Sequence, residues 1–103
     1  MTGATLAGSK LAGADLTGAN LAGADLAYID LTGAKLGGAI LSWSNLKMSN
    51  LAGARLAGAD FTGANLAGAD FTGARLAGAD FAGAKINKWT KGLIVGHVGK
   101  ITK

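Results

Sequence analysis

The sequence predicts an all-β fold in which the chain winds into a coil. Three observations predict it: a five-residue period, a large apolar residue at the same position of every unit, and a glycine two residues later in most units. From Leu6 to Ile86 the apolar position recurs seventeen times without a slip, as thirteen Leu, three Phe and one Ile. This period fits neither a helix nor unbroken alternation, and a glycine in every unit would cost a helix about 1 kcal/mol each time.

Each unit is predicted to form three residues of strand followed by a corner. Alanine stands two residues before the large apolar residue in thirteen of the seventeen units, so both side chains face the same way in an extended segment. The residue between them, usually Asp, Asn, Lys or Arg, then faces solvent. Glycine stands two residues after the large residue in thirteen units and can adopt the positive φ of a tight turn. Successive coils therefore stack by a backbone ladder.

The units match the motif A-[D/N]-L-x-x, as in AGADLTGANLAGADL (residues 12–26) and GADFTGANLAGADFTGARLAGADF (residues 58–81). By this motif the chain resembles the pentapeptide-repeat family over residues 4 to about 88. The resemblance implies a right-handed quadrilateral parallel β-helix, a β-solenoid with four units per coil and about four coils. Such uniform units are also typical of an engineered or consensus-like member. We divide the chain into a β-helix over residues 1–88 and a short C-terminal cap or basic tail over residues 89–103.

Large outward residues gather in one region of this coil. With four units per coil, residues twenty apart lie above one another, and corner positions that elsewhere hold glycine hold Tyr28, Trp43 and Met48. Together with Ile40 and Lys47 they are predicted to form a contact patch for a protein partner, because aromatic residues and Met are enriched at interface cores. The alternative is that these side chains only cover the Ala/Gly surface, since singly exposed apolar residues are common.

Charge is divided unevenly along the chain. Residues 1–83 hold five cations and six Asp, whereas residues 84–103 hold five Lys and no acid, which gives the net charge of +4. We predict that the tail caps the last coil or exchanges with a second subunit, because the end of a coil exposes an open ladder and an apolar cross-section. The candidate cap or association residues are Trp89, Leu93, Ile94, Val95, Val98 and Ile101. The alternative is a basic arm for nucleic acid or an acidic membrane, which five Lys without Arg support weakly.

Residues for catalysis are scarce. His97 is the only His, and the chain has no Cys and no Glu to accompany it. The tail segment GLIVGHVGKIT (residues 92–102) departs from the phosphate-binding pattern G-x-x-x-x-G-K-[S/T] at two positions, Ile94 and Ile101. We therefore predict that the protein is not an enzyme and uses no cofactor, metal or small-molecule substrate.

The sequence thus favours a structural or protein-binding solenoid that self-associates, as a dimer or other homo-oligomer, through a coil end or the tail. One alternative follows from the resemblance: some family members mimic B-form DNA and bind DNA gyrase, protecting it from quinolones. That activity requires a strongly acidic surface, whereas residues 1–83 carry a net charge of only −1. Another alternative is an engineered scaffold without a biological function. No apolar run approaches the roughly 20 residues that span a bilayer, and a cytoplasmic location is expected.

Overall fold

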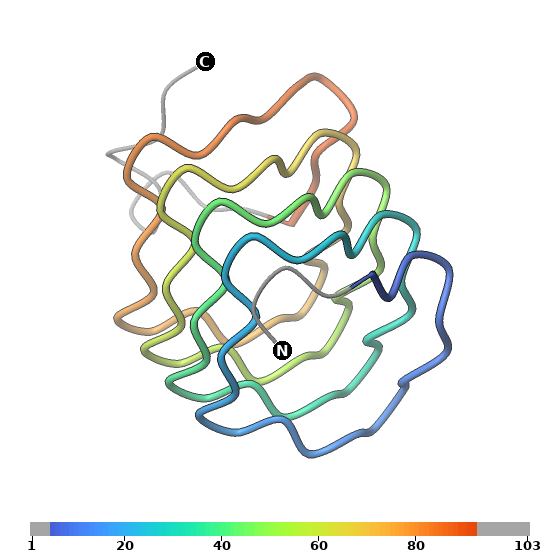
Figure 1. Cartoon of the computed structure of the whole chain (residues 1–103), viewed down its shortest axis with the longest axis vertical. Coiled ribbons are helices and arrows are strands. Elements are labelled where there is room, and N and C mark those ends of the chain that lie inside the picture. Colours follow the sequence, from blue (N-terminus) through green and yellow to red (C-terminus); the bar gives the residue numbers. More distant parts are fainter. Residues whose placement is uncertain (1–4, 93–103) are drawn as a thin grey trace.

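The computed structural model describes residues 5–92, which wind into a four-sided coil (Figure 1). In place of helices or longer strands, this part of the chain forms isolated parallel bridges between residues twenty positions apart, except for the last bridge, between Asp70 and Lys91. The bridging residues fall into four columns, one for each side of the coil: Thr5, Asp25, Asn45, Asn65 and Lys85 on side 1; Lys10, Asp30, Asn50, Asp70 and Lys91 on side 2; Asp15, Lys35, Arg55 and Arg75 on side 3; Asn20, Ile40, Asp60 and Asp80 on side 4.

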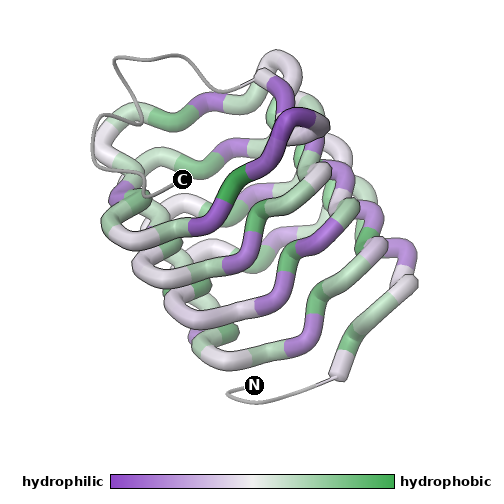
Figure 2. The backbone as a smooth tube through the Cα atoms, turned by 90° about the horizontal axis from the view of Figure 1, so that it is seen from above, coloured by the Kyte–Doolittle hydropathy of each residue, from purple (hydrophilic) through white to green (hydrophobic). Residues whose placement is uncertain are grey.

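The bridges match the predicted stacking of each residue on the one twenty positions later. For example, the N–H of Asp30 donates to the carbonyl of Ser9 at 2.9 Å, and the carbonyl of Asp30 accepts from the N–H of Leu11 at 2.8 Å. The extended segments are shorter than the three residues predicted, because a turn precedes and follows every side. Only the middle residue of each side pairs as a parallel bridge, and polar residues consequently align from coil to coil (Figure 2).

The interior is filled by the large apolar residue of each unit and by the small residue two positions before it. The inward leucines from Leu21 to Leu66 are buried, as are the three phenylalanines. Phe61 and Phe81 belong to side 4 and stack face to face with 4.9 Å between ring centroids, and Phe71 meets both edge-on from side 2. Each buried Leu or Phe stabilises the fold by roughly 1.5–3 kcal/mol.

Burial is less complete in the first coil. Leu6, Leu11 and Leu16 are only partly buried, although they occupy the same inward position as the leucines of later coils. The N-terminal end of the described coil therefore differs from its middle, where every inward leucine is buried.

Asp and Asn recur at the middle of each side because their side chains cap the corner that follows. The Asp30 carboxylate accepts the backbone N–H of Thr32 at 3.0 Å and the Thr32 hydroxyl at 2.6 Å. Asn50 accepts the N–H of Ala52 at 3.0 Å in the same way. In residues 5–92 this N–H, two positions after the bridge, takes no part in the backbone ladder. The short polar side chain therefore gives it a partner, as in an Asx turn.

The ladder changes register at its C-terminal end. Lys91 bridges Asp70, an offset of 21 residues in place of twenty. A turn over Asn87–Thr90 takes up the extra residue, with the N–H of Thr90 donating to the carbonyl of Asn87 at 3.1 Å. The side chain of Asn87 accepts the N–H of Gly68 at 2.9 Å, in the place where a backbone carbonyl accepts in earlier coils.

Candidate functional site

Three corner residues adopt a backbone conformation that favours glycine. The backbone φ is 59° at Tyr28, 59° at Trp43 and 60° at Met48, close to the 67° of Gly33 at an ordinary corner. A side chain in this left-handed region costs roughly 1–2 kcal/mol because Cβ approaches the following carbonyl oxygen. The regular corner turn, which needs positive φ at its third residue, imposes the conformation on whatever residue stands there.

Two of these side chains lie along the coil axis, over the glycine of the next coil. A Cβ added to Gly63 would come within 2.4 Å of the Trp43 ring, and one added to Gly68 within 2.2 Å of the Met48 sulfur. The indole therefore lies directly on the Gly63 backbone, and the thioether lies on that of Gly68. Only glycine leaves room for these side chains to lie there, so each bulky residue and its glycine form a matched pair.

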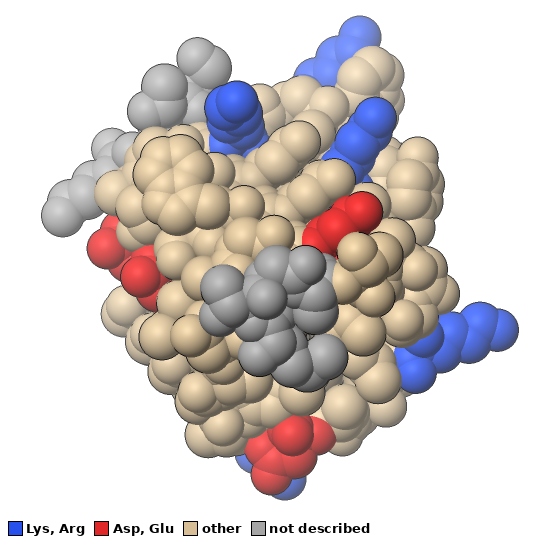
Figure 3. Space-filling model, viewed as in Figure 1, with Lys and Arg blue, Asp and Glu red and all other residues tan. Residues whose placement is uncertain are grey.

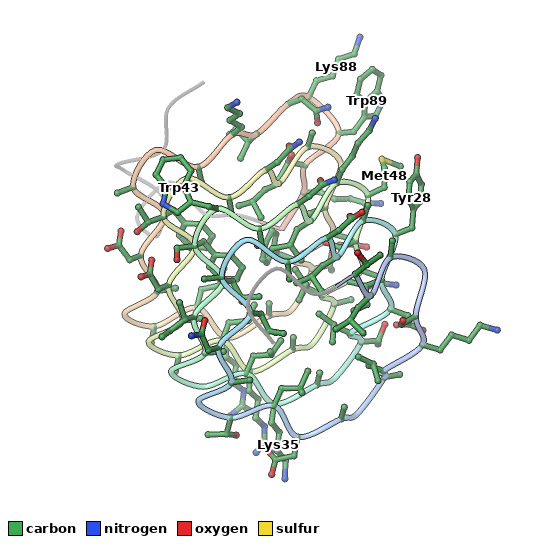
Figure 4. All side chains as sticks on the ribbon, in the orientation of Figure 1. Tyr28, Lys35, Trp43, Met48, Lys88 and Trp89 are labelled. Carbon is green, nitrogen blue, oxygen red and sulfur yellow. The ribbon has the colours of Figure 1, made fainter. Side chains whose placement is uncertain are left out.

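The predicted patch residues do not all share one surface. Trp43 and Met48 stand at the two corners that flank side 1 (Figure 4). Lys47 lies within the turn that ends at Met48. Tyr28 precedes Met48 at the same corner, one coil earlier. Ile40, by contrast, bridges Asn20 and Asp60 on side 4.

These side chains are open to solvent. The exposed fraction is 72% for Trp43, 62% for Tyr28 and 47% for Met48, against 39% for Ile40. Side 1 and its two corners thus carry most of the exposed apolar surface of the predicted patch.

Trp89 extends the Tyr28–Met48 corner toward the C-terminal end. It lies in the Asn87–Thr90 turn, is 62% exposed, and has the Lys88 ammonium 4.6 Å from its ring centroid (Figure 4). The other predicted cap residues lie outside the described residues: Leu93, Ile94, Val95, Val98 and Ile101.

The charged residues on the other sides form rows. Lys35, Arg55 and Arg75 stack on side 3, and Asp60 and Asp80 stack on side 4. Within residues 5–92 a single ion pair is present, between the Lys91 ammonium and the Asp70 carboxylate at 4.0 Å. Figure 3 shows a largely uncharged face on which cationic side chains project at the edges and acidic side chains form several small separate patches.

Three carboxylates have lowered pKa values. The pKa of Asp30 is held below its ordinary value by the hydroxyl of Thr32 and then by the Thr32 N–H. Thr17 lowers the pKa of Asp15 and Thr72 that of Asp70 in the same way. The hydrogen bonds of the Asx turns stabilise the ionised carboxylates, and the lowered pKa values are the result.

The described residues offer apolar rings, a thioether, amides and ammonium groups, which suit contact with another macromolecule. Residues 5–92 contain no group of three His, Cys, Asp or Glu that could hold a metal ion. That part of the chain also has no helix with the length and apolar character of a membrane span.

The stacking predicted from the sequence located Tyr28, Trp43 and Met48 correctly at corners, but it missed the role of Gly63 and Gly68. A signal was present: both glycines stand twenty residues after a bulky corner residue. The direction of the two side chains along the axis is what brings each pair into contact.

Comparison with known proteins agrees with this architecture. A pentapeptide repeat protein from Nostoc Pcc 7120 is 29% identical, with a TM-score of 0.86 over 95% of this chain and 84% of that chain. One from the thylakoid lumen of Arabidopsis thaliana is 30% identical, with a TM-score of 0.57 over 84% of this chain and 71% of that chain. No curated protein matches the sequence.

The family model for pentapeptide repeats matches residues 1–38, 39–76 and 49–87, in eight copies. The matched segments cover the whole of the coil up to the turn at Asn87, and the solved structures share its form. The resemblance found in the sequence is confirmed, and the chain belongs to the pentapeptide repeat family.

Proposed function

We propose that this protein is a non-enzymatic β-solenoid, wound with a right hand, that binds protein and self-associates. The observation that carries the proposal is the presence of Tyr28, Trp43 and Met48 at corners where glycine would avoid the strain. Strained residues that persist in a fold cluster at functional sites. Because all three are exposed, their own burial does not offset the strain, which favours a role in contact with a partner.

Self-association through a coil end or the tail is the form of binding we propose first. The inward leucines of the first coil, Leu6, Leu11 and Leu16, are only partly buried and support it at one end. At the other end the sequence of the tail supports it, because its apolar residues are suited to cover the end of a second coil.

A DNA-like role toward gyrase receives less support. A mimic of DNA needs an acidic surface, whereas side 3 presents Lys35, Arg55 and Arg75 in one row. A supercoiling assay with DNA gyrase provides the test, and we expect no inhibition and no protection from quinolones.

The proposal is tested by the mass in solution. Light scattering on the full-length chain over a range of concentrations should give a mass above 10.1 kDa, the mass of one chain. The variant Leu93→Ser with Val95→Ser should lower that mass if the tail forms the contact. A monomer at every concentration, with no partner captured through Trp43 or Tyr28, would contradict the proposal.

A further inference from the structure

Side 1 and its two flanking corners form a face with a projection at the centre of each edge. At one edge Trp43 lies over Gly63, and at the other Met48 lies over Gly68. Both side chains start in one coil and end over the next, so they reach the same level along the coil axis. Between them lie Asn45 and Asn65, which bridge each other on side 1. We call this surface the side 1 face.

Along the middle column of this face the charge reverses from one end to the other. Asp25 lies on the N-terminal half and Lys85 on the C-terminal half, with the neutral Asn45 and Asn65 between them. Neither Asp25 nor Lys85 has an ionic partner among residues 5–92, where the single ion pair lies on side 2. The half-buried carboxylate of Asp25 has the amide of Asn45 at 3.4 Å and the N–H of Ala27 at 3.2 Å.

We propose that the side 1 face binds a second copy of this chain with the two coil axes antiparallel. The two-fold axis lies in the interface and runs across side 1, between Asn45 and Asn65. A rotation about it reverses the order of the coils and leaves each corner opposite its own counterpart. An interface of this kind is isologous, so every contact occurs twice.

Charge complementarity is the first argument for this arrangement. Asp25 lies one and a half coil spacings from the two-fold axis on its N-terminal side, and Lys85 lies as far from it on its C-terminal side. The rotation therefore brings Asp25 opposite Lys85 of the partner subunit, and Lys85 opposite Asp25 of the partner subunit. If the two-fold axis instead ran parallel to the coil axes, the coils would be parallel. Like charges would then lie opposite one another, which is repulsive.

The apolar projections are the second argument. Because Trp43 reaches over Gly63, its ring lies level with the two-fold axis. The rotation therefore brings it against Trp43 of the partner subunit. Met48 reaches over Gly68 and meets Met48 of the partner subunit in the same way. Tyr28 comes opposite Trp89 of the partner subunit at the same corner. Stacked aromatic rings contribute binding energy beyond the area that they bury, and aromatic residues and Met are enriched in protein interfaces.

The arrangement accounts for the strained corners. Trp43 and Met48 keep positive φ at the two positions nearest the axis, where an isologous contact uses each side chain twice. The corners of side 3, which the dimer leaves exposed, hold glycine instead: Gly13, Gly33, Gly53 and Gly73 at one edge, Gly18, Gly38, Gly58 and Gly78 at the other.

The area of the face is small for a dimer interface. With extents of 27 × 21 × 21 Å, one side of the coil can bury about 570 Å² per copy, or on the order of 1,100 Å² in total, at the low end for specific interfaces. We therefore expect a reversible dimer whose population depends on concentration. This inference rests on the proposed binding role but uses a surface separate from the coil ends and the tail.

The first test replaces the projections by the residue that other corners carry. Trp43→Gly with Met48→Gly removes both side chains and the strain that positive φ causes for a residue with a Cβ. The coil is therefore expected to keep its fold. Sedimentation velocity on the full-length chain should show at least about a tenfold weaker dimer, as expected for loss of the Trp43 and Met48 contacts. Circular dichroism and thermal unfolding confirm that the variant remains folded.

The second test exchanges the charges. Asp25→Lys and Lys85→Asp should each weaken the dimer about tenfold, because each sets like charges opposite one another. The variant that carries both exchanges restores opposite charges and should recover the affinity to within about threefold. Matched controls are Asp80→Lys, whose carboxylate also accepts one corner N–H, and Arg55→Asp, since both lie on other sides.

The outcomes separate this inference from the proposed function. Dissociation by the side 1 variants, with recovery in the double exchange, supports the antiparallel face. Dissociation by Leu93→Ser with Val95→Ser alone supports association through the tail and overturns the face. Equal affinity in the Trp43→Gly, Met48→Gly variant, or a double exchange no better than either single one, overturns the face as well, as does a parent chain that is monomeric at millimolar concentration.

Discussion

The indole ring of Trp43 occupies the space in which Gly63 would carry a Cβ, only 2.4 Å from where that atom would lie. This contact joins two positions twenty residues apart on one corner of the coil. It explains how a bulky residue is accommodated at a positive-φ corner: the side chain finds its place on the bare backbone of the next coil. The same relationship holds between Met48 and Gly68.

Substitution of Trp43 separates the strain at the corner from the cover that the indole provides. Trp43→Ala keeps the left-handed backbone with a Cβ, whereas Trp43→Gly removes the strain, and both lose the ring. We expect the free energy of unfolding of Trp43→Gly to exceed that of Trp43→Ala by about 1 kcal/mol. Urea unfolding followed by circular dichroism measures the difference, and equal stabilities would show that φ at this corner is not strained.

Gly63→Ala tests the contact from the other residue. Both Gly63 and Gly53 have positive φ, and a Cβ on Gly53 would meet nothing within 4 Å. We expect each substitution to lower the free energy of unfolding by about 1 kcal/mol for the backbone alone. Gly63→Ala should in addition displace the indole and change the tryptophan emission, whereas Gly53→Ala should not. An unchanged spectrum in Gly63→Ala would place the ring elsewhere.

Ser49→Ala is expected to stabilise the protein. The Ser49 hydroxyl is buried without a hydrogen-bond partner, at a position where most units carry alanine. Removing an unsatisfied buried hydroxyl should raise the free energy of unfolding by roughly 1 kcal/mol. Ser44→Ala is the matched control, because the Ser44 hydroxyl donates to the Leu41 carbonyl at 2.6 Å. If chemical unfolding shows the same change in both variants, the missing partner at Ser49 has no energetic consequence.

The Asx turns predict a loss of stability in acid. The pKa of Asp30 lies below its ordinary value of 3.8 in the folded state, chiefly because of the Thr32 hydroxyl. Stability from this bond is therefore fully present above pH 3.8 and is lost as the pH falls through the lower folded pKa. Thr32→Val should raise the pKa of Asp30, and Thr32→Ser should leave it low. Carboxyl titration by NMR measures both, and an unshifted pKa in Thr32→Val would contradict the assignment.

The regular part of the fold was predictable residue by residue. The five-residue period places a bridge on every side, and thirteen glycines mark the corners, so the columns of the coil follow from counting. The length of the extended segments was overestimated because the sequence pattern shows which residues face inward, whereas backbone pairing depends on the φ of the turn residues on either side.

The candidate site was predictable in position and only partly in form. Counting by twenty places Tyr28 and Met48 at one corner and Trp43 at another, but it does not give the direction of a side chain at positive φ. The turn at Asn87–Thr90 was not foreseen either, since its extra residue is held by side chains. There the Asn87 amide oxygen and the Thr90 hydroxyl both accept the N–H of Gly68, in place of the backbone carbonyl that accepts at earlier corners.

The one-residue offset at Lys91 has a consequence for building longer versions of this coil. The next residue, Gly92, stands where every earlier rung has Leu, Phe or Ile, and a Cβ there would lie 2.3 Å from the Phe71 backbone. New repeats joined after Gly92 would start without an interior side chain. They would also start where the backbone of Gly92 lies too close to that of Phe71 to admit one. Repeats inserted before Asn87 would instead keep the twenty-residue register, so the number of coils can be changed only on the N-terminal side of this turn.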